Sequence, residues 1–210
     1  MISWIFPRQG AYYDRYLTFR GEGEAVISEW KTAFVRYMKK LTYRYRRPIV
    51  LKSPAHTGRI RLLLELFPNA RFVHIHRNPY HVYRSTRRFY HQAVSSLRLQ
   101  RPPAGGVEKG ILRRYNLLYD AFFQERDLIP QGRYCEVAFE TLERDKLGEM
   151  RRIYETLGLG DPDVVAPGLR AYVESISGYK KNRYPPLRRG LRLRIAEAWR
   201  RSFLEWGYAI

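Results

Sequence analysis

The 210-residue sequence contains a single cysteine, Cys135, and this scarcity excludes two kinds of architecture. A disulfide framework needs pairs of thiols, and a zinc site of the thiolate type needs several. The sequence also has no apolar run near the roughly 18 residues that cross a membrane. Residues 1–10 lack the charged start and the long apolar stretch of a secretory signal. We therefore expect a protein of a reducing compartment, or one indifferent to redox state, and predict a cytoplasmic location.

The composition is that of a folded and strongly basic protein. Apolar residues make up 45% of the chain and aromatic residues 15%, which is enough for the core of one domain over residues 1–210. The formal net charge is +19. A nucleic-acid surface, an anionic membrane surface and a site for a multiply charged anion each fit such a charge, so the charge alone does not choose among them.

The spacing of apolar residues predicts helices that alternate with short strands. Residues 22–45 carry apolar side chains three and four apart, which predicts a long amphipathic helix with a basic outer face. Further helices are predicted around Ile60–Phe67 and over residues 79–93, 107–126, 141–157, 163–173 and 191–206. Strands are predicted at residues 48–51, 71–76 and 132–139.

This order predicts an α/β fold in which helices flank a parallel sheet. Ligands of such sheets bind beyond the carboxyl ends of the strands. The segments 52–56 and 77–85 both follow predicted strands, so we expect both at that edge. Residues 95–110 are predicted to form a loop, and residues 175–190 an irregular basic stretch.

The segment from Arg77 to Ser85 has the chemistry of a phosphate site. A strand leads to Arg77, and Pro79 suits the first turn of a helix, whose free amides favour an anion. Arg offers a fork of donors and Ser a hydroxyl, and both can reach one phosphate. Without further context, an arginine at a strand edge and a serine on a helix surface explain the same pattern.

The run from Val50 to Ser85 resembles the nucleotide-binding core of sulfotransferases that use 3′-phosphoadenosine 5′-phosphosulfate. The resemblance implies a P-loop-NTPase-like fold, in which Arg77 and Ser85 bind the 3′-phosphate of this co-substrate. One departure is His81, where many members carry an aspartate. Residues 137–142 also resemble a family strand end, with Glu140 either structural or an orienter of basic residues.

Two further segments gain roles from the resemblance. Lys52-Ser53-Pro54-Ala55-His56 is similar to the segment that bears the family's general base. It implies that His56 deprotonates the acceptor hydroxyl, which its near-neutral pKa suits, and that Lys52 offsets charge on the transferring sulfonate. A helix-start cap and a surface lysine are the plain alternatives. Residues 178–184 resemble the basic loop over the 3′-phosphate, which implies binding by Lys180, Lys181 and Arg183, with a solvated loop as the alternative.

One family segment has no counterpart before Pro48. Members carry a first strand and a glycine-rich loop of the type Pro-Lys/Arg-Ser-Gly-Thr-Thr, which wraps the 5′-phosphosulfate, and the chain has no G-x-x-x-x-G-K-[ST] either. The expectation is therefore an N-terminally truncated sulfotransferase domain, without the first strand, the loop and the first helix.

Three functions follow from these patterns. The first is transfer of a sulfuryl group to a hydroxyl or amine of a small-molecule, glycan or lipid acceptor, with activity of this chain in question because the loop is missing. The second is non-catalytic binding of adenosine 3′,5′-bisphosphate, and the third is binding of nucleic acid through the basic surface. No metal is expected: His74 and His76 share one side of a predicted strand, but no third ligand accompanies them.

Overall fold

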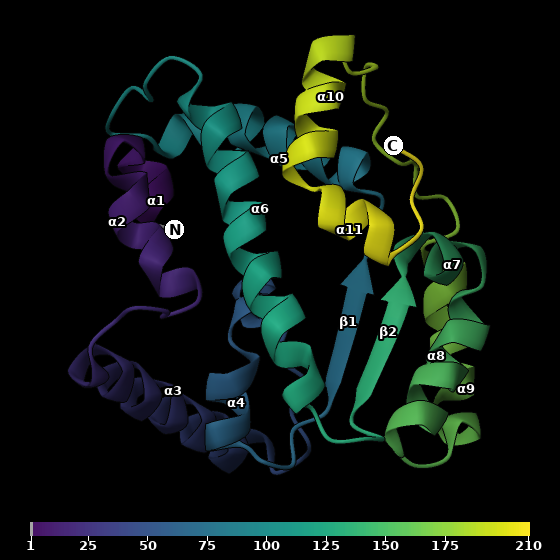
Figure 1. Ribbon diagram of the computed structural model, residues 1–210. Helices are drawn as coiled ribbons and strands as arrows, with labels where there is room; N and C mark the ends of the chain where they lie inside the picture. The colour runs from purple at the N-terminus through teal and green to yellow at the C-terminus, as the bar shows by residue number, and fades with distance from the viewer. Residues whose placement is uncertain (1) are drawn as a thin grey trace. The chain divides into compact units, whose positions relative to one another are not determined.

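The computed structural model describes residues 2–210, which form two compact units. The first unit contains the residues up to Ala70 together with Phe89–Leu128. The second contains Arg71–Arg88 and Ile129–Ile210. Helix α5 (Pro79–Gln92) therefore contributes residues to both units (Figure 1).

The first unit is helical. Its core includes Ile60 and Leu63 of α4 (Ile60–Leu66) and Phe122 of α6 (Gly106–Glu125), all less than 10% exposed. The long α3 (Glu24–Tyr45) packs beside α4, but none of its residues is fully buried, so the apolar face of the predicted amphipathic helix is only partly covered. The remaining elements of this unit are α1 (Ile2–Ile5), η1 (Pro7–Gln9), α2 (Gly10–Asp14), η2 (Arg15–Leu17), η3 (Pro54–Gly58), η4 (Ser95–Leu97) and η5 (Arg126–Leu128).

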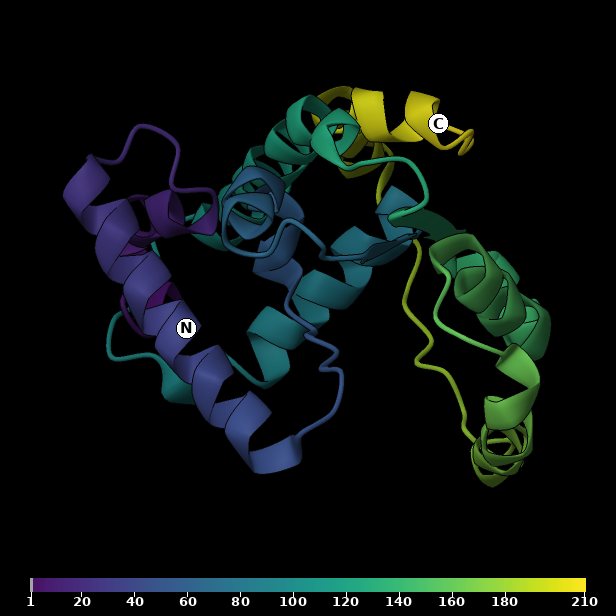
Figure 2. The same ribbon diagram turned by 90° about the horizontal axis from the view of Figure 1, so that it is seen from below.

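The second unit is built on two parallel strands, β1 (Phe72–His76) and β2 (Tyr134–Ala138), which lie side by side in Figure 1. The register pairs Phe72 with Tyr134 and His76 with Ala138. One face of β2 is covered by α8 (Lys146–Leu157), because Cys135 and Val137 pack against Ile153 and Leu157. The helices α7 (Phe139–Arg144), α8 and α9 (Pro162–Ser175) stand together beside β2 when viewed from below (Figure 2).

Aromatic side chains form a second cluster in this unit, between α5 and the C-terminal helices. The C-terminal helices α10 (Arg189–Ala198) and α11 (Arg200–Glu205) meet the start of α5 through these rings. Trp199 contacts Tyr83, and Phe203 contacts Tyr80 at a centroid distance of 4.7 Å. Burial of rings of this size dominates the energetics of a small core, so this cluster anchors the first turns of α5 against the C-terminal helices.

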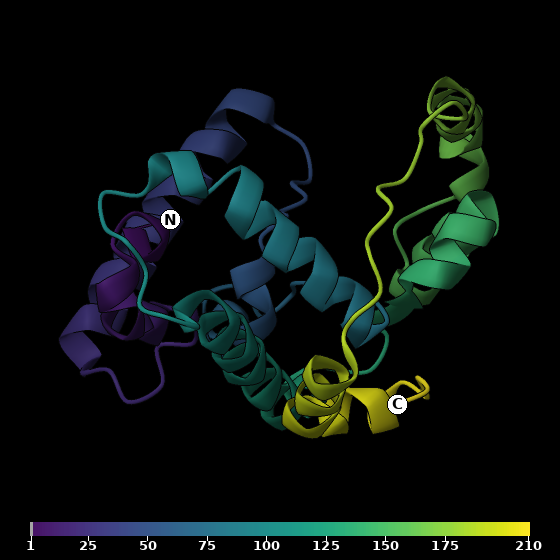
Figure 3. The same cartoon turned by 90° about the horizontal axis from the view of Figure 1, so that it is seen from above.

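Most predicted elements are confirmed, including α3, β1, α5, α6 and β2. The predicted strand at residues 48–51 is wrong: the segment carries no strand pairing in the structure, and Val50 is 94% exposed. Its apolar residues suit a strand, but a strand forms only where a neighbour takes its backbone hydrogen bonds. The predicted helix 141–157 is two helices, and 191–206 breaks at Trp199. The irregular stretch predicted at residues 175–190 is confirmed over residues 176–188, which run from α9 to α10 (Figure 3), whereas its ends belong to these helices.

Candidate functional site

A tight turn joins β1 to α5 and is held by hydrogen bonds of Asn78. Asn78 caps α5, because its Oδ1 accepts the amide hydrogen of Tyr80 at 3.0 Å, and Pro79 occupies the first helical position. The amide of Asn78 itself donates to Glu140 Oε1 at 3.1 Å. The start of α5 thus has a fixed place at the carboxyl end of β1. Its first amides are paired within the protein, because Tyr80 donates to the Asn78 side chain and the next two residues donate to the Asn78 carbonyl, so free helix amides do not supply the anion site that the sequence predicted.

Arg77 lies on this turn, between the strand and the cap. Its guanidinium group stacks over the ring of Phe139, 4.0 Å from Cζ to the ring centroid. Its Nε is buried and has no hydrogen-bond partner among the described residues. A buried donor that the protein leaves unpaired is uncommon, and an acceptor supplied by a ligand satisfies it.

Ser85 follows Asn78 by seven residues, which is about two helical turns, so both lie on the same face of α5. The neighbouring Arg84 resembles Arg77, since its Nε is also buried without a hydrogen-bond partner within residues 2–210. Arg84 and Arg88 both lie near the ring of Tyr184, at 6.0 and 5.9 Å. Arg77 thus precedes α5, whereas Arg84 and Ser85 lie in its second turn.

The basic coil after α9 meets this helix through an aromatic residue that the sequence did not single out. Tyr184 makes the contact with α5. Of the predicted phosphate ligands on the coil, Lys181 pairs with Glu143 of α7 at 2.5 Å, and Lys180 and Arg183 are exposed. The coil thus contacts α5 through Tyr184 and α7 through the ion pair of Lys181 with Glu143.

The two residues predicted for catalysis lie in the first unit, whereas Arg77 and Ser85 lie in the second. Lys52 is exposed in an extended stretch, and His56 is half-buried in η3, with its ring edge-on to Phe34 at 5.7 Å. Burial, followed by the positive charge of Arg59, holds the pKa of His56 below its usual value. Its Nδ1 is buried without a hydrogen-bond partner among the described residues. A neutral imidazole with an unpaired ring nitrogen has the chemistry of a proton acceptor.

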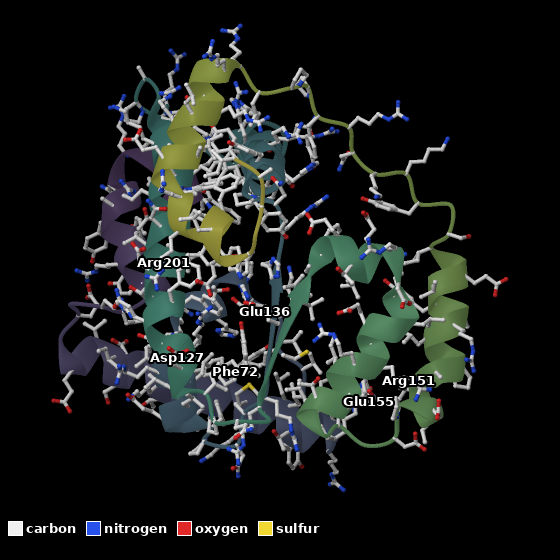
Figure 4. All side chains as sticks on the ribbon, turned by 45° about the vertical axis from the view of Figure 1, so that its right-hand side comes forward. Phe72, Asp127, Glu136, Arg151, Glu155 and Arg201 are labelled. Atoms are coloured by element: carbon white, nitrogen blue, oxygen red, sulfur yellow. The ribbon has the colours of Figure 1, made fainter. Side chains whose placement is uncertain are left out.

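The histidines of β1 have protein partners. His74 Nδ1 lies 3.2 Å from Glu136 Oε1, and the same oxygen accepts from Tyr134 and Trp206 (Glu136 is labelled in Figure 4). Burial alone would raise the pKa of Glu136, but these hydrogen bonds outweigh it and lower the pKa to about 2. No group of three or more His, Cys, Asp or Glu side chains suited to a metal ion occurs in the described part of the chain.

Three contacts around the turn between β1 and α5 were not foreseen from the sequence. They are the stacking of Arg77 on Phe139, the hydrogen bond from the turn to Glu140, and the hydrogen bond from the Tyr208 hydroxyl to Glu140. Glu140 was predicted as structural or as an orienter of basic residues, and its position beside Arg77 suits both descriptions. The stacked residues, Arg77 and Phe139, are 62 positions apart in the sequence, so no local sequence pattern indicates their contact. The end of a paired strand, a capped helix start and the buried, unpaired Nε atoms of Arg77 and Arg84 thus lie in one stretch of the second unit.

The family model for the sulfotransferase family matches residues 8–163, and the chain belongs to this family. It is similar to the omega-hydroxy-beta-dihydromenaquinone-9 sulfotransferases of Mycobacterium bovis and Mycobacterium tuberculosis, each 34% identical over 207 residues. That alignment covers 99% of this chain and 53% of each relative, so the chain spans about half the length of the curated relatives it matches. No solved structure matches the chain. Among the described residues, every helix is too short or too polar to span a lipid bilayer.

Proposed function

We propose that the chain takes part in transfer of a sulfuryl group from 3′-phosphoadenosine 5′-phosphosulfate to a hydroxyl or amine. Arg77 and Ser85 bind the 3′-phosphate, aided by Lys180, Lys181 and Arg183 on the coil. Family membership supports the reaction, and the observation that carries the assignment of the site is the buried, unpaired Nε of Arg77 at the start of a capped helix. The fold proposed is P-loop-NTPase-like.

The chemical step proposed is an in-line displacement at sulfur. The acceptor oxygen or nitrogen forms a bond to sulfur while the bond from sulfur to the phosphate oxygen breaks, which releases adenosine 3′,5′-bisphosphate. His56 takes the proton of the acceptor, and Lys52 offsets the charge of the sulfonate. The lowered pKa of His56 supports this role, because the imidazole is then neutral at pH 7.

Calorimetric titration tests the phosphate assignment. The wild-type chain should bind adenosine 3′,5′-bisphosphate more tightly than adenosine 5′-phosphate, and Arg77→Ala should remove most of this preference, a loss of about 10- to 100-fold for a charge-assisted contact. Arg71→Ala is the matched control, because Arg71 is an exposed arginine just before the other end of β1. A chain that binds neither nucleotide would contradict the proposal.

Binding without catalysis is the second candidate, because the proposed nucleotide ligands and the proposed base belong to different units of the chain. Transfer of labelled sulfate from the co-substrate to an acceptor separates the two: a chain that binds the bisphosphate but transfers nothing is a nucleotide-binding protein. If the chain instead binds duplex DNA with a steep salt dependence that Arg77→Ala does not change, the +19 charge serves nucleic acid.

For the acceptor, we propose a lipid hydroxyl. The two relatives are named for a hydroxylated menaquinone derivative, and they are similar to this chain over almost its whole length. A long-chain primary alcohol in detergent should then accept sulfate better than a sugar of equal concentration. The single buried cysteine supports the prediction of a reducing, cytoplasmic setting.

A further inference from the structure

The chain after α11 turns back toward the end of β1 through a helix-terminating motif. The amide of Tyr208 donates to the carbonyl of Phe203 at 2.9 Å, and that of Gly207 to Leu204 at 3.4 Å. This pair of bonds is the Schellman arrangement, which needs a left-handed residue one position after the helix cap. Gly207 supplies it with φ of +63°. The reversal places the Tyr208 side chain beside the turn of Arg77 and Asn78 between β1 and α5, called the phosphate turn below because of its proposed role.

The Tyr208 hydroxyl bridges two groups of the second unit. It donates to Glu140 Oε2 at 2.8 Å and lies 2.9 Å from His76 Nδ1. An ionised carboxylate can only accept, so the single hydroxyl hydrogen goes to Glu140. The tyrosine oxygen must then accept a hydrogen from Nδ1 of His76. The direction of the chain of bonds is therefore fixed.

Glu140 continues this chain to the phosphate turn. Its two carboxylate oxygens have different partners: Oε2 accepts from Tyr208, and Oε1 accepts from the amide of Asn78. Asn78 is the residue after Arg77 and the cap of α5, and Phe139, on which Arg77 stacks, precedes Glu140. The backbone on one side of Arg77 and the ring beneath it are thus tied to one carboxylate, and that carboxylate is oriented by Tyr208.

The placement of this carboxylate is electrostatically odd for a phosphate site. A negative charge next to Arg77 opposes a second anion, so simple electrostatics predicts weaker phosphate binding because of Glu140. Burial would raise the pKa of Glu140, but the hydrogen bonds from Asn78 and Tyr208 outweigh it, and the group stays ionised at neutral pH. An ionised Glu140 beside Arg77 is explained if its hydrogen bonds are needed to hold the phosphate turn in place.

We propose that Tyr208 is a positioning residue for recognition of the 3′-phosphate, acting through Glu140 on the turn that carries Arg77. This inference rests on the proposed function, because it concerns the same phosphate site. Tyr208 itself does not contact the nucleotide. Its hydroxyl orients the carboxylate that holds the Asn78 amide, and so keeps the Arg77 side chain on Phe139 ready for the phosphate.

The test compares binding of adenosine 3′,5′-bisphosphate and adenosine 5′-phosphate by calorimetry, with the ratio of the two Kd values as the readout. Tyr208→Phe removes only the hydroxyl and should lower the ratio about fivefold, as expected for one hydrogen bond. Tyr134→Phe is the matched control: its hydroxyl also donates to a carboxylate of this unit, Glu136, but not to the phosphate turn. It should leave the ratio unchanged.

Two variants of the exposed Glu140 separate positioning from charge, and they keep the test valid even if Tyr208→Phe does not fold. Glu140→Ala removes both charge and acceptor, and the proposal expects the ratio to fall. Glu140→Gln removes the charge but keeps an acceptor oxygen, so the ratio should equal or exceed that of the wild type. A rise in the ratio with Glu140→Ala would overturn the inference.

The outcome also distinguishes this inference from the proposed function. If Arg77→Ala lowers the ratio while Tyr208→Phe leaves it unchanged, the phosphate site stands and the role of Tyr208 is wrong. If Arg77→Ala has no effect, the proposed function fails, and the inference fails with it. Unfolding curves of each variant, followed by circular dichroism, show that the compared chains are folded.

Discussion

The turn that carries Arg77 and the segment that carries His56 differ in how firmly the described protein holds them. The first lies between a paired strand and a capped helix, and Asn78, Glu140 and Tyr208 fix its backbone. The second follows an extended stretch in which Val50 is 94% exposed, and His56 contacts Phe34 by its ring edge. The turn that carries Arg77 is therefore held within the second unit by strand pairing and side-chain hydrogen bonds. The stretch before η3 forms no strand, and η3 itself packs against α6 in the first unit.

The comparison teaches that similar sequence patterns reach different degrees of order. Both segments read as an apolar strand, a basic residue and a helix start. Only β1 has a parallel neighbour to take its hydrogen bonds, and that pairing aligns its end with β2.

The largest effect is expected for His56→Ala on sulfate transfer. Loss of a general base should reduce the rate about 10²- to 10⁴-fold. Affinity for adenosine 3′,5′-bisphosphate should not change, because its proposed ligands lie in the other unit. His91→Ala, an exposed histidine of the first unit, is the control. Because the pKa of His56 is lowered, the wild-type rate should fall only as the pH drops below about 6.5 and stay level above it.

The second effect concerns the core behind the phosphate turn. Phe203 is fully buried against Tyr80 near the start of α5, so Phe203→Ala should lower the free energy of unfolding by about 3–5 kcal/mol. Urea unfolding measures it. The adjacent Leu204 is 63% exposed, and Leu204→Ala should change the free energy by less than about 1 kcal/mol. Equal losses in both variants would contradict the packing described for α11.

A smaller effect is expected from the carboxylate network on β2. The pKa of Glu136 is lowered to about 2 from its usual value of 4.5, so its ionised form stabilises the fold above pH 4.5, and this stabilisation is lost as the pH falls toward 2. Glu136→Gln should therefore cost about 1–3 kcal/mol at pH 7. Urea unfolding at pH 7 and pH 3.5 should show the gap between variant and wild type narrowing in acid, and a constant gap would argue against the network.

The smallest effect is expected at the segment before His56. Val50→Ser changes a side chain that is almost fully exposed, and it should alter the free energy of unfolding by no more than about 0.5 kcal/mol. Val137→Ser, a change of the same kind at a fully buried strand position, is the comparison and should cost several times more. A large loss from Val50→Ser would mean that residues 48–51 are buried as the sequence predicted.

Much of the fold was predictable because local patterns determine it. The apolar spacing of α3 and the Asn78-Pro79 start of α5 are read directly from the sequence. The break between α7 and α8 had a local signal as well: Asp145 caps α8 by accepting the amide of Gly148 at 2.8 Å. A continuous apolar pattern across residues 141–157 concealed it.

The remaining features depend on contacts between distant residues. The Tyr208 hydroxyl forms hydrogen bonds with Glu140 and His76, which lie 68 and 132 positions earlier in the sequence. The stacking of Arg77 on Phe139 depends on the register of β1 with β2. No spacing within the sequence encodes such distances. The strand expected at residues 48–51 failed for the same reason, since residue preference favours a strand but only a partner makes one.

The buried Cys135 allows the opening of the second unit to be measured by the rate at which its thiol is alkylated. Its thiol is 2% exposed between β2 and α8, and it is the sole cysteine of the chain. An alkylating reagent can reach it only when the second unit opens, so the labelling rate counts opening events in that unit alone. Protection of this one sulfur by a nucleotide would then report, without any engineered probe, how strongly the ligand keeps the phosphate-binding unit closed.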